Sequence, residues 1–400
     1  MKNTKNLILG SLLVASSIYA NEKTSNLESY LNSIKIDNTI KIANVKYDMK
    51  GSKTYATGIG GFSRINFPIY KDTISFELAP YFGVSLNDLS GDNDSYESSL
   101  TSKNENFMTL GEANLNIKLE NGGIIIGRQI IDTPLMGDDD LRLTNQTFEG
   151  VMANYSLNDL TLKAGYFTKW QGFDAGILDV NSKEFYKFQK IGTKDTNGVT
   201  VIGLEHSKST SFMDLYTRAY YYDIDNYSKV SYLDMNINKK INENISADFG
   251  VQYTKQNEQN DSNVEGELYG LFTGLAYDKF YLSAAYTKSK LDDSNTLFNG
   301  FGGEFYFTAM NEYAMGYLTV GEDEKALSLG LSYDLNDKFN LSMYTTTFKT
   351  KSDKVQENDL YLTYSFNENL VGEFIYANIE NKKDDNESYD NFIYRVSLTF

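Results

Sequence analysis

The feature that most constrains the fold of this chain is an alternation of apolar and polar residues with a period of two. Successive side chains of a β-strand point to opposite faces, so each alternating run predicts a strand with one apolar and one polar face. Beyond its first twenty residues, the chain holds no apolar stretch near the length of about 20 residues that a membrane-spanning helix needs. The sequence therefore predicts an all-β fold. The clearest runs lie at residues 74–84, 112–119, 245–253, 327–334 and 339–344.

The last strand-like run shows the same alternation and stops on an aromatic residue. Its apolar positions are Phe392, Tyr394, Val396, Leu398 and Phe400. A strand that ends in this way resembles the closing strand of bacterial outer-membrane barrels, in which this end is the signal read by the barrel-assembly machinery. A water-soluble β-sandwich is the alternative. We expect a transmembrane antiparallel β-barrel whose apolar side chains face lipid and whose polar side chains face an aqueous lumen, because polar groups cannot face hydrocarbon cheaply.

The first residues have the pattern of a secretory signal peptide. Lys2 and Lys5 precede an apolar core that is too short to span a bilayer as a helix, and a cleavage site follows that ends in the small residue Ala20. After it, apolar residues at the i, i+3, i+4, i+7 spacing predict a short amphipathic helix. We predict a signal peptide at 1–20, a short periplasmic segment at 21–35 and an outer-membrane barrel at 36–400.

Composition narrows the classes of partner. The chain carries a formal net charge of −17, with 31 Tyr, 24 Phe and no Cys. So acidic a balance argues against nucleic acid as a partner, because binding to the nucleic-acid backbone depends on Lys and Arg. So many aromatic residues argue against a disordered chain and suit strands with one apolar face. Without cysteine, no disulfide can form.

The connections between strand-like runs alternate between short and long. Short turns recur, for example at residues 120–121, 158–159 and 278–279, with longer links between them. Periplasmic turns and extracellular loops of outer-membrane barrels alternate in this way, and the count is about 18 strands. We allow 16, because residues 301–309 are either an extra strand or a folded-in loop. A barrel of 16–18 strands leaves an aqueous channel.

Few residues offer catalytic or metal chemistry. His206 is the only histidine, and its neighbour Ser207 points to the opposite face of a strand, so a phospholipase triad is improbable. One His without Cys also makes a zinc site improbable. Acidic loop pairs such as Asp384-Asp385 lack the calcium-loop spacing, and solvated loop charge is the better interpretation. Trp170 is interpreted as a residue of the interfacial aromatic girdle. We predict no enzymatic activity, no metal and no cofactor.

The stretch from Gly122 to Leu157 contains two strand-like runs around a long link. The link holds Thr133-Pro134 and an acidic run, and it ends in Gln146-Thr147-Phe148-x-Gly150. This pattern resembles the third-loop region of OprD-type porins, although Thr144 and Asn145 stand where that family has Leu and Pro. The resemblance covers this stretch and the C-terminal strand. It implies that the third loop folds inward and narrows a channel.

The resemblance also implies a constriction with acids on one side and a ladder of wall cations on the other. The eyelet candidates in the third loop are Asp138, Asp139, Asp140 and Arg142. The wall candidates are Arg64, Arg128, Arg218, Arg395, Lys118 and Lys163. Lumenal acids are common on the predicted polar faces, and a confined charged pore focuses the field, so we predict a weak preference for cations.

The resulting hypothesis is a water-filled porin in the outer membrane of a Gram-negative bacterium, through which ions and small polar solutes diffuse. The expected partners are outer-membrane lipid, lipopolysaccharide and the barrel-assembly machinery, and porins of this kind often form homotrimers. The alternative from another class is an adhesin or structural barrel whose surface loops bind a partner. The sequence does not choose a preferred solute.

Overall fold

The structure is a computed structural model of the chain. It describes residues 24–86, 100–101, 105–138, 142–177, 186–192, 196–292, 294–303, 306–318 and 321–400. The predicted signal peptide at 1–20 therefore lies outside the described residues. The chain divides into two units, residues 1–35 and residues 36–400.

The first unit contains the helix α2 (Thr24–Ser33), at the place where the apolar spacing predicts one. No helix in the described part of the chain is long and apolar enough to cross a membrane.

Eighteen antiparallel strands form a closed barrel, which confirms the predicted fold class and the higher of the two strand counts. A further short strand, β8 (Gln189–Lys190), pairs only with β7 and lies in the connection that follows β7. Residues 301–309 contribute no strand where they are described. The barrel strands are β1 (Lys35–Met49), β2 (Ser52–Tyr70), β3 (Ile74–Ser85), β4 (Phe107–Leu119), β5 (Gly122–Gln129), β6 (Thr147–Leu157), β7 (Leu160–Gln171), β9 (Val199–Ser209), β10 (Met213–Ile224), β11 (Ser228–Lys240), β12 (Ile245–Glu258), β13 (Gly266–Tyr277), β14 (Phe280–Lys290), β15 (Lys325–Asn336), β16 (Phe339–Lys349), β17 (Lys354–Ser365), β18 (Leu370–Asn381) and β19 (Tyr389–Thr399).

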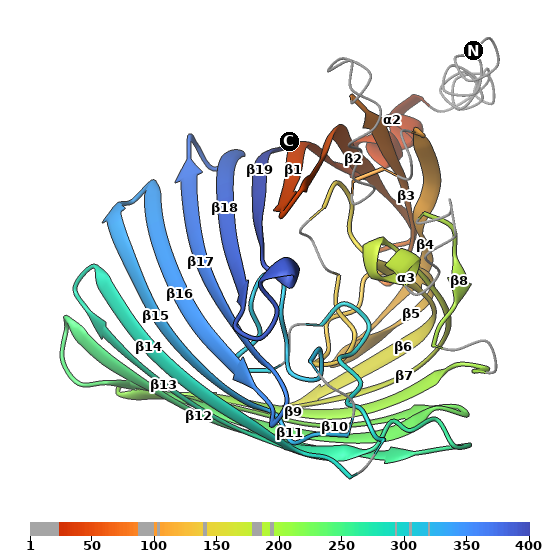
Figure 1. Ribbon diagram of the computed structural model, residues 1–400. Helices are drawn as coiled ribbons and strands as arrows, with labels where there is room; N and C mark the ends of the chain where they lie inside the picture. The colour runs from red at the N-terminus through yellow and green to blue at the C-terminus, as the bar shows by residue number, and fades with distance from the viewer. Residues whose placement is uncertain are drawn as a thin grey trace. The chain divides into compact units, whose positions relative to one another are not determined.

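The barrel closes where its first and last strands meet. β1 pairs with β19 in register from Thr39 opposite Thr399 to Met49 opposite Tyr389 (Figure 1). Beyond this register, the Asn38 N–H donates to the Phe400 carbonyl at 2.9 Å, and the Phe400 N–H donates to the Asn38 carbonyl at 3.0 Å. The sheet therefore has no free edge along this seam.

The two ends of the barrel differ in their connections. At one end the strands are joined by short turns, in which Asn158 and Asp278 take positive φ angles of 52°. Asn and Asp tolerate this conformation, which two-residue hairpin turns require. At the other end lie the long connections, including those between β5 and β6 and between β14 and β15. This is the predicted rhythm of periplasmic turns and extracellular loops.

The two faces of the wall follow the alternation in the sequence. On β15, Leu327, Leu329 and Leu331 are exposed on the outer face, where lipid would cover them. On β10, Tyr221 is 38% exposed, whereas its neighbours Tyr220 and Tyr222 are buried on the inner face. Side chains on the inner face of a wide barrel are buried only where other groups cover them. Here, connections of the chain itself cover them.

The largest apolar cluster lies between the inner wall and two inward connections, residues 130–146 and 291–324, whose described residues run inside the ring of strands (Figure 1). Trp170 belongs to it, is 2% exposed and packs against Phe148 and Phe301, with ring centroids 6.1 and 5.1 Å away. The interpretation of Trp170 as a girdle residue is therefore wrong. Position at a strand end predicted a rim residue, but the inward loops cover the inner face at this height.

Candidate functional site

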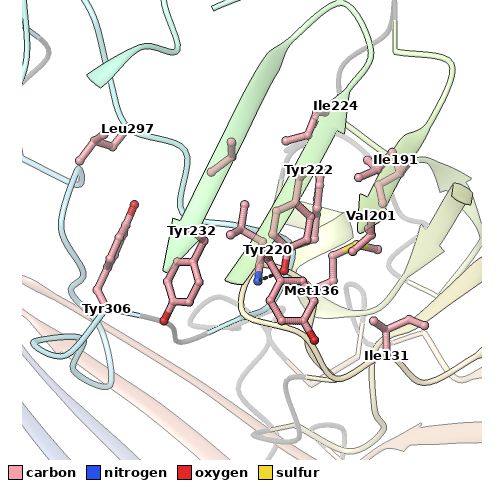
Figure 2. Close-up of a cluster of buried hydrophobic side chains, with 14 of the residues drawn as sticks. Ile131, Met136, Ile191, Val201, Tyr220, Tyr222, Ile224, Tyr232, Leu297 and Tyr306 are labelled. Atoms are coloured by element: carbon pink, nitrogen blue, oxygen red, sulfur yellow. Dashed lines mark hydrogen bonds between the residues drawn. The ribbon is translucent and has the colours of Figure 1, made fainter. Parts of the chain in front are cut away.

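The described residues of the third loop, 130–138 and 142–146, fold into the barrel as predicted. Its described first half makes a tight turn, in which Thr133 N–H donates to the Met136 carbonyl at 2.9 Å. Leu135 and Met136 are fully buried, and the Leu135 N–H donates to the Tyr222 hydroxyl of β10 at 3.2 Å (Figure 2). A wall hydroxyl thus satisfies a backbone donor of the loop, which fixes the turn against the inner face.

A second inward connection, residues 291–324, packs on the third loop. Phe301 N–H donates to the Leu135 carbonyl at 2.6 Å, and Gly137 N–H donates to the Phe301 carbonyl at 3.2 Å. Leu297 and Tyr306 of this connection belong to the cluster that also holds Met136 (Figure 2). The two loops therefore form one constriction, and the ambiguous residues around 301–309 are part of a folded-in loop.

The eyelet candidates are only partly described. Asp138 is half-buried, and its carboxylate accepts from Asn145 Nδ2 at 2.9 Å. Asp139 and Asp140 lie outside the described residues. Arg142 is 8% exposed, and its guanidinium lies 4.1 Å from the ring centroid of Phe173, in the short helix α3 (Phe173–Ile177). The structure thus places Asp138 and Arg142 in the inward loop, and their role in an eyelet stays a prediction.

Four predicted wall cations are each held by a wall carboxylate. The Arg64 Nη2 lies 2.6 Å from Glu112 Oε1. The same arrangement recurs on other strands, with the remaining pairs being Arg218–Asp234 at 2.5 Å, Arg395–Glu373 at 2.6 Å and Lys163–Glu205 at 3.0 Å. Arg218 and Arg395 lie directly opposite their acids on neighbouring strands. Arg64 of β2 reaches across β3 to Glu112 of β4. The pairs therefore form within the wall. They are ion pairs, so little of their positive charge is free to face the lumen.

The two remaining wall candidates are in different surroundings. Arg128 pairs with Glu149 at 2.9 Å and lies over the ring of Phe188, 4.1 Å from its centroid. Lys169 shares the same carboxylate at 2.6 Å. Lys118 is exposed next to the short turn that follows β4. The lumenal role of both residues also stays a prediction.

The second inward connection is attached to the wall by carboxylates that sequence reasoning missed. Glu357 of β17 accepts from two successive backbone N–H groups, those of Glu312 and Tyr313, both at 2.9 Å. Asp359 accepts from the preceding one, Asn311 N–H, at 3.1 Å. Glu357 is fully buried and Asp359 is 4% exposed. Three consecutive donors of residues 306–318, the docked segment, are therefore satisfied by two wall carboxylates.

A third carboxylate holds the far end of the docked segment. Gly316 N–H donates to Glu324 Oε2 at 2.6 Å, and Glu324 is 2% exposed. Burial raises the pKa of Glu324 to about 7, and the hydrogen bond from Gly316 offsets part of that rise. We call Glu324, Glu357 and Asp359 the carboxylate clamp. Each of these bonds satisfies a backbone donor that docking buries, so the clamp stabilises the docked position.

Glu312, within the docked segment, reaches back to the seam of the barrel. Its carboxylate accepts from the Tyr47 hydroxyl of β1 at 3.3 Å and from the Tyr389 hydroxyl of β19 at 3.2 Å. Burial raises the pKa of Glu312 to about 7, while the nearby charge of Arg142 lowers it in part. Glu312 and Arg142 come from the two inward loops, so opposite charges meet across the constriction.

His206 lies within β9, in register with Leu160 of β7 and Thr217 of β10. Among the described residues, no group of three His, Cys, Asp or Glu side chains is arranged to hold a metal ion.

The signal for Glu357 and Asp359 was present in the sequence. Both fall on one face of β17 with Val355, so alternation alone would have named them as lumenal acids. Their partners could not be named in the same way, because the donors are backbone groups of a loop without periodicity.

Comparison with known proteins places this geometry in context. The model of the family described as "outer membrane porin, OprD family" matches residues 73–338 of the chain. None of the curated proteins matches it in sequence. Among solved structures, the chain is similar to OpdK of Pseudomonas aeruginosa, with a TM-score of 0.78 and 16% identity over 93% of this chain and 99% of OpdK.

Two further structures show the same fold. OccK9 (OpdG) of Pseudomonas aeruginosa has a TM-score of 0.78 and 15% identity, and the match covers 93% of this chain and 99% of OccK9. OccAB3 of Acinetobacter baumannii has a TM-score of 0.76 and 16% identity, with 92% and 99% covered. One further structure is that of OpdK with vanillate.

Proposed function

The chain belongs to the OprD family of outer-membrane porins, and on that premise we propose that it forms a water-filled channel through which ions and small polar solutes diffuse, with a weak preference for cations. Passive diffusion needs no cofactor, and the proposal assigns the chain no enzymatic reaction.

The observation that carries the cation preference is the pairing of the wall cations. Arg64, Arg218, Arg395 and Lys163 each lie within 3.0 Å of a carboxylate oxygen. A paired cation contributes little net field, and the chain as a whole carries 54 Asp and Glu against 37 Lys and Arg. Fixed charge in a confined pore biases ion entry at low salt, so the excess of carboxylates favours cations.

The test is the reversal potential of a planar bilayer that holds the refolded protein between two KCl concentrations. We expect the sign of a channel that passes K⁺ more readily than Cl⁻, and a smaller value at high salt because the fixed charge is then screened. An anion-selective sign would refute the preference. Changing Asp138, Asp139 and Asp140 together to Asn is expected to shift this potential. An unchanged potential would show that these residues do not line the eyelet.

A solute experiment tests the same proposal independently. Vanillate, the molecule present in one OpdK structure, is a small aromatic carboxylate. We expect it to enter proteoliposomes no faster than a neutral aromatic solute of the same size. Faster entry of vanillate would contradict a lumen whose cations are neutralised.

The channel proposal itself is separated from the alternative, an adhesin or structural barrel, by single-channel recording. A bilayer that conducts no current at any voltage would refute the channel and favour the adhesin or structural barrel. For partners, we propose that the strand ending at Phe400 is recognised by the barrel-assembly machinery and that the barrel forms homotrimers. Native mass spectrometry of the protein in detergent measures the latter, and a monomer alone would contradict it.

A further inference from the structure

Four lysines form a row across four adjacent strands. Lys288 lies two residues before the end of β14, and Lys349 is the last residue of β16. Lys325 and Lys354 are the first residues of β15 and β17. The strand register places Lys288 directly opposite Lys325, Lys325 opposite Lys349, and Lys349 opposite Lys354. We call these four residues the lysine row. Neighbouring strands lie about 4.8 Å apart, so the row spans roughly 14 Å.

The lysine row lies on the outer face at the end of the barrel that carries the long connections. Tyr286 and Leu327, two residues farther along their strands on the same face, are opposite each other and exposed. Below them the apolar outer face continues to Phe280 and Tyr333, whose rings stack with centroids 4.5 Å apart.

The height of the row follows from strand geometry. From Phe280 to Lys288 the strand runs about 26 Å at roughly 3.3 Å per residue. At a tilt of about 40°, this is roughly 20 Å along the membrane normal, close to the full height of the apolar band of such barrels. The flexible lysine side chains extend farther toward water. The row therefore lies where the apolar band meets the head groups of the outer leaflet.

Several other lysines at this end of the barrel have an acidic neighbour. Lys53 lies 2.9 Å from Asp48, and Lys255 lies 3.5 Å from Glu267. Lys50 lies 2.9 Å from Asp385, and Lys229 is in register with Asp223. In contrast, none of the four lysines of the row forms an ion pair with an acid in the part of the chain that the structure describes.

The acids adjacent to the row in sequence are Glu324 and Asp353. They accept from the backbone N–H groups of Gly316 and Lys354, both at 2.6 Å. The next acids are engaged by the loops. Glu322 accepts from the backbone and the hydroxyl of Ser352, both at 2.8 Å. Asp323 accepts from Leu291 N–H at 2.9 Å. Like charges directly opposite each other in a sheet are destabilising, so the row calls for an external anion.

We propose that the lysine row binds the phosphate groups of the phosphorylated glycolipid of the outer leaflet. The row is at head-group depth and faces the lipid, which excludes a soluble protein partner from its lower edge. Its width over four strands suits a ligand that carries more than one phosphate at one depth. Lysine ammonium groups are compact charges that bind phosphate oxygens without a fixed geometry, as a lipid head group in motion requires.

The experiment compares two matched variants of the full-length protein in detergent. The row variant carries Lys→Gln at the four row positions, and the control variant carries Lys→Gln at Lys50, Lys53, Lys229 and Lys255. Both lose the same charge at the same end of the barrel. Native mass spectrometry measures the binding of three probes, which are bisphosphorylated lipid A, chemically dephosphorylated lipid A and phosphatidylglycerol.

We expect the row variant to bind bisphosphorylated lipid A more weakly by roughly fivefold for each lysine removed, and the control variant to bind it like the wild type. Binding to the wild type should weaken as salt is raised. Equal weakening of both variants would overturn the site, and equal binding of dephosphorylated lipid A would overturn the phosphate contact. Equally tight phosphatidylglycerol would overturn the glycolipid as the ligand.

Thermal unfolding gives a second readout, which a purely structural role of the lysines would not produce. Without lipid, the row variant should unfold at the same or a higher temperature than the wild type, because repulsion within the row is removed. With bisphosphorylated lipid A, the wild type should gain stability and the row variant should not. A row variant that is less stable without lipid and gains as much with it would overturn the proposal.

Discussion

Replacing Glu357 by Gln tests whether the carboxylate clamp sets the width of the channel. Both oxygens of Glu357 accept a backbone N–H of the docked segment at 2.9 Å, and the side chain is fully buried. Gln has the same shape but only one acceptor oxygen, so its amide nitrogen faces one of the two N–H groups. A buried donor left without an acceptor costs about 1–3 kcal/mol.

The expected cost of undoing this contact is therefore about 2 kcal/mol, which lowers the ratio of docked to undocked segment roughly thirtyfold. When the segment leaves the wall, the lumen is wider. Single-channel recording should show longer or more frequent openings to a higher conductance level, and liposome swelling should admit larger sugars. Asp359→Asn, which retains an oxygen for the single Asn311 donor, should have a smaller effect in the same direction.

Asp248→Asn is the matched control, because it also removes a wall carboxylate. Asp248 accepts from Asn238 Nδ2 at 2.7 Å, a bond between two strands of the wall. We expect the control to alter ion selectivity slightly and to leave conductance levels and the size limit unchanged. If Glu357→Gln has the same conductance levels and the same size limit as the wild type, the clamp does not set the width. If no variant and no wild-type protein conducts, the channel proposal itself is wrong.

Three further results are expected. The pKa of Glu312 is about 7 in the docked state, against an ordinary 4.5, so docking takes up a proton. Docking is therefore strongest below about pH 4.5 and weakens as the pH rises through 7. The fraction of time spent at high conductance should rise with pH, and Glu312→Gln should flatten that profile. Arg218→Gln leaves the buried carboxylate of Asp234 without its cation and should lower the free energy of unfolding by roughly 3 kcal/mol. The double variant that also carries Asp234→Asn should recover stability. An unchanged melting curve of Arg218→Gln would contradict this. Fluorescence of Trp170, the only tryptophan, should resist quenching by brominated lipid because its side chain is buried inside the barrel. Strong quenching would show instead that Trp170 belongs to the interfacial girdle.

The strands could be predicted from the sequence because each one carries its own evidence. In a barrel every strand contacts lipid on one face, so a residue such as Leu329 must alternate with a polar neighbour wherever the strand occurs. The same local rule placed Arg218 and Arg395 in the wall. It could not show that both are paired, because the register that brings Asp234 opposite Arg218 depends on the length of the intervening turn.

The inside of the barrel follows no such rule. Trp170 and Phe301 meet although they are far apart in sequence, and nothing periodic in residues 291–324 indicates where that loop goes. The site of Glu312 is assembled from the docked segment and from both strands at the seam, through Tyr47 and Tyr389. Contacts made by loops are set by the shape of the space that the strands enclose, so they become visible only when the barrel is closed.

The pairing of β1 with β19 has a consequence for the order in which the barrel is built. Every other neighbouring pair of barrel strands is connected by a single turn or loop, whereas Asn38 and Phe400 are separated by 362 positions along the chain. The entropy lost on joining two points grows with the length of chain between them, so hairpins form early and this join forms last. Until then, the Tyr47 and Tyr389 hydroxyls that hold Glu312 are on separate edges. The constriction is therefore completed by the same event that closes the barrel wall. A folding intermediate in which β1 and β19 are still unpaired lacks the complete constriction.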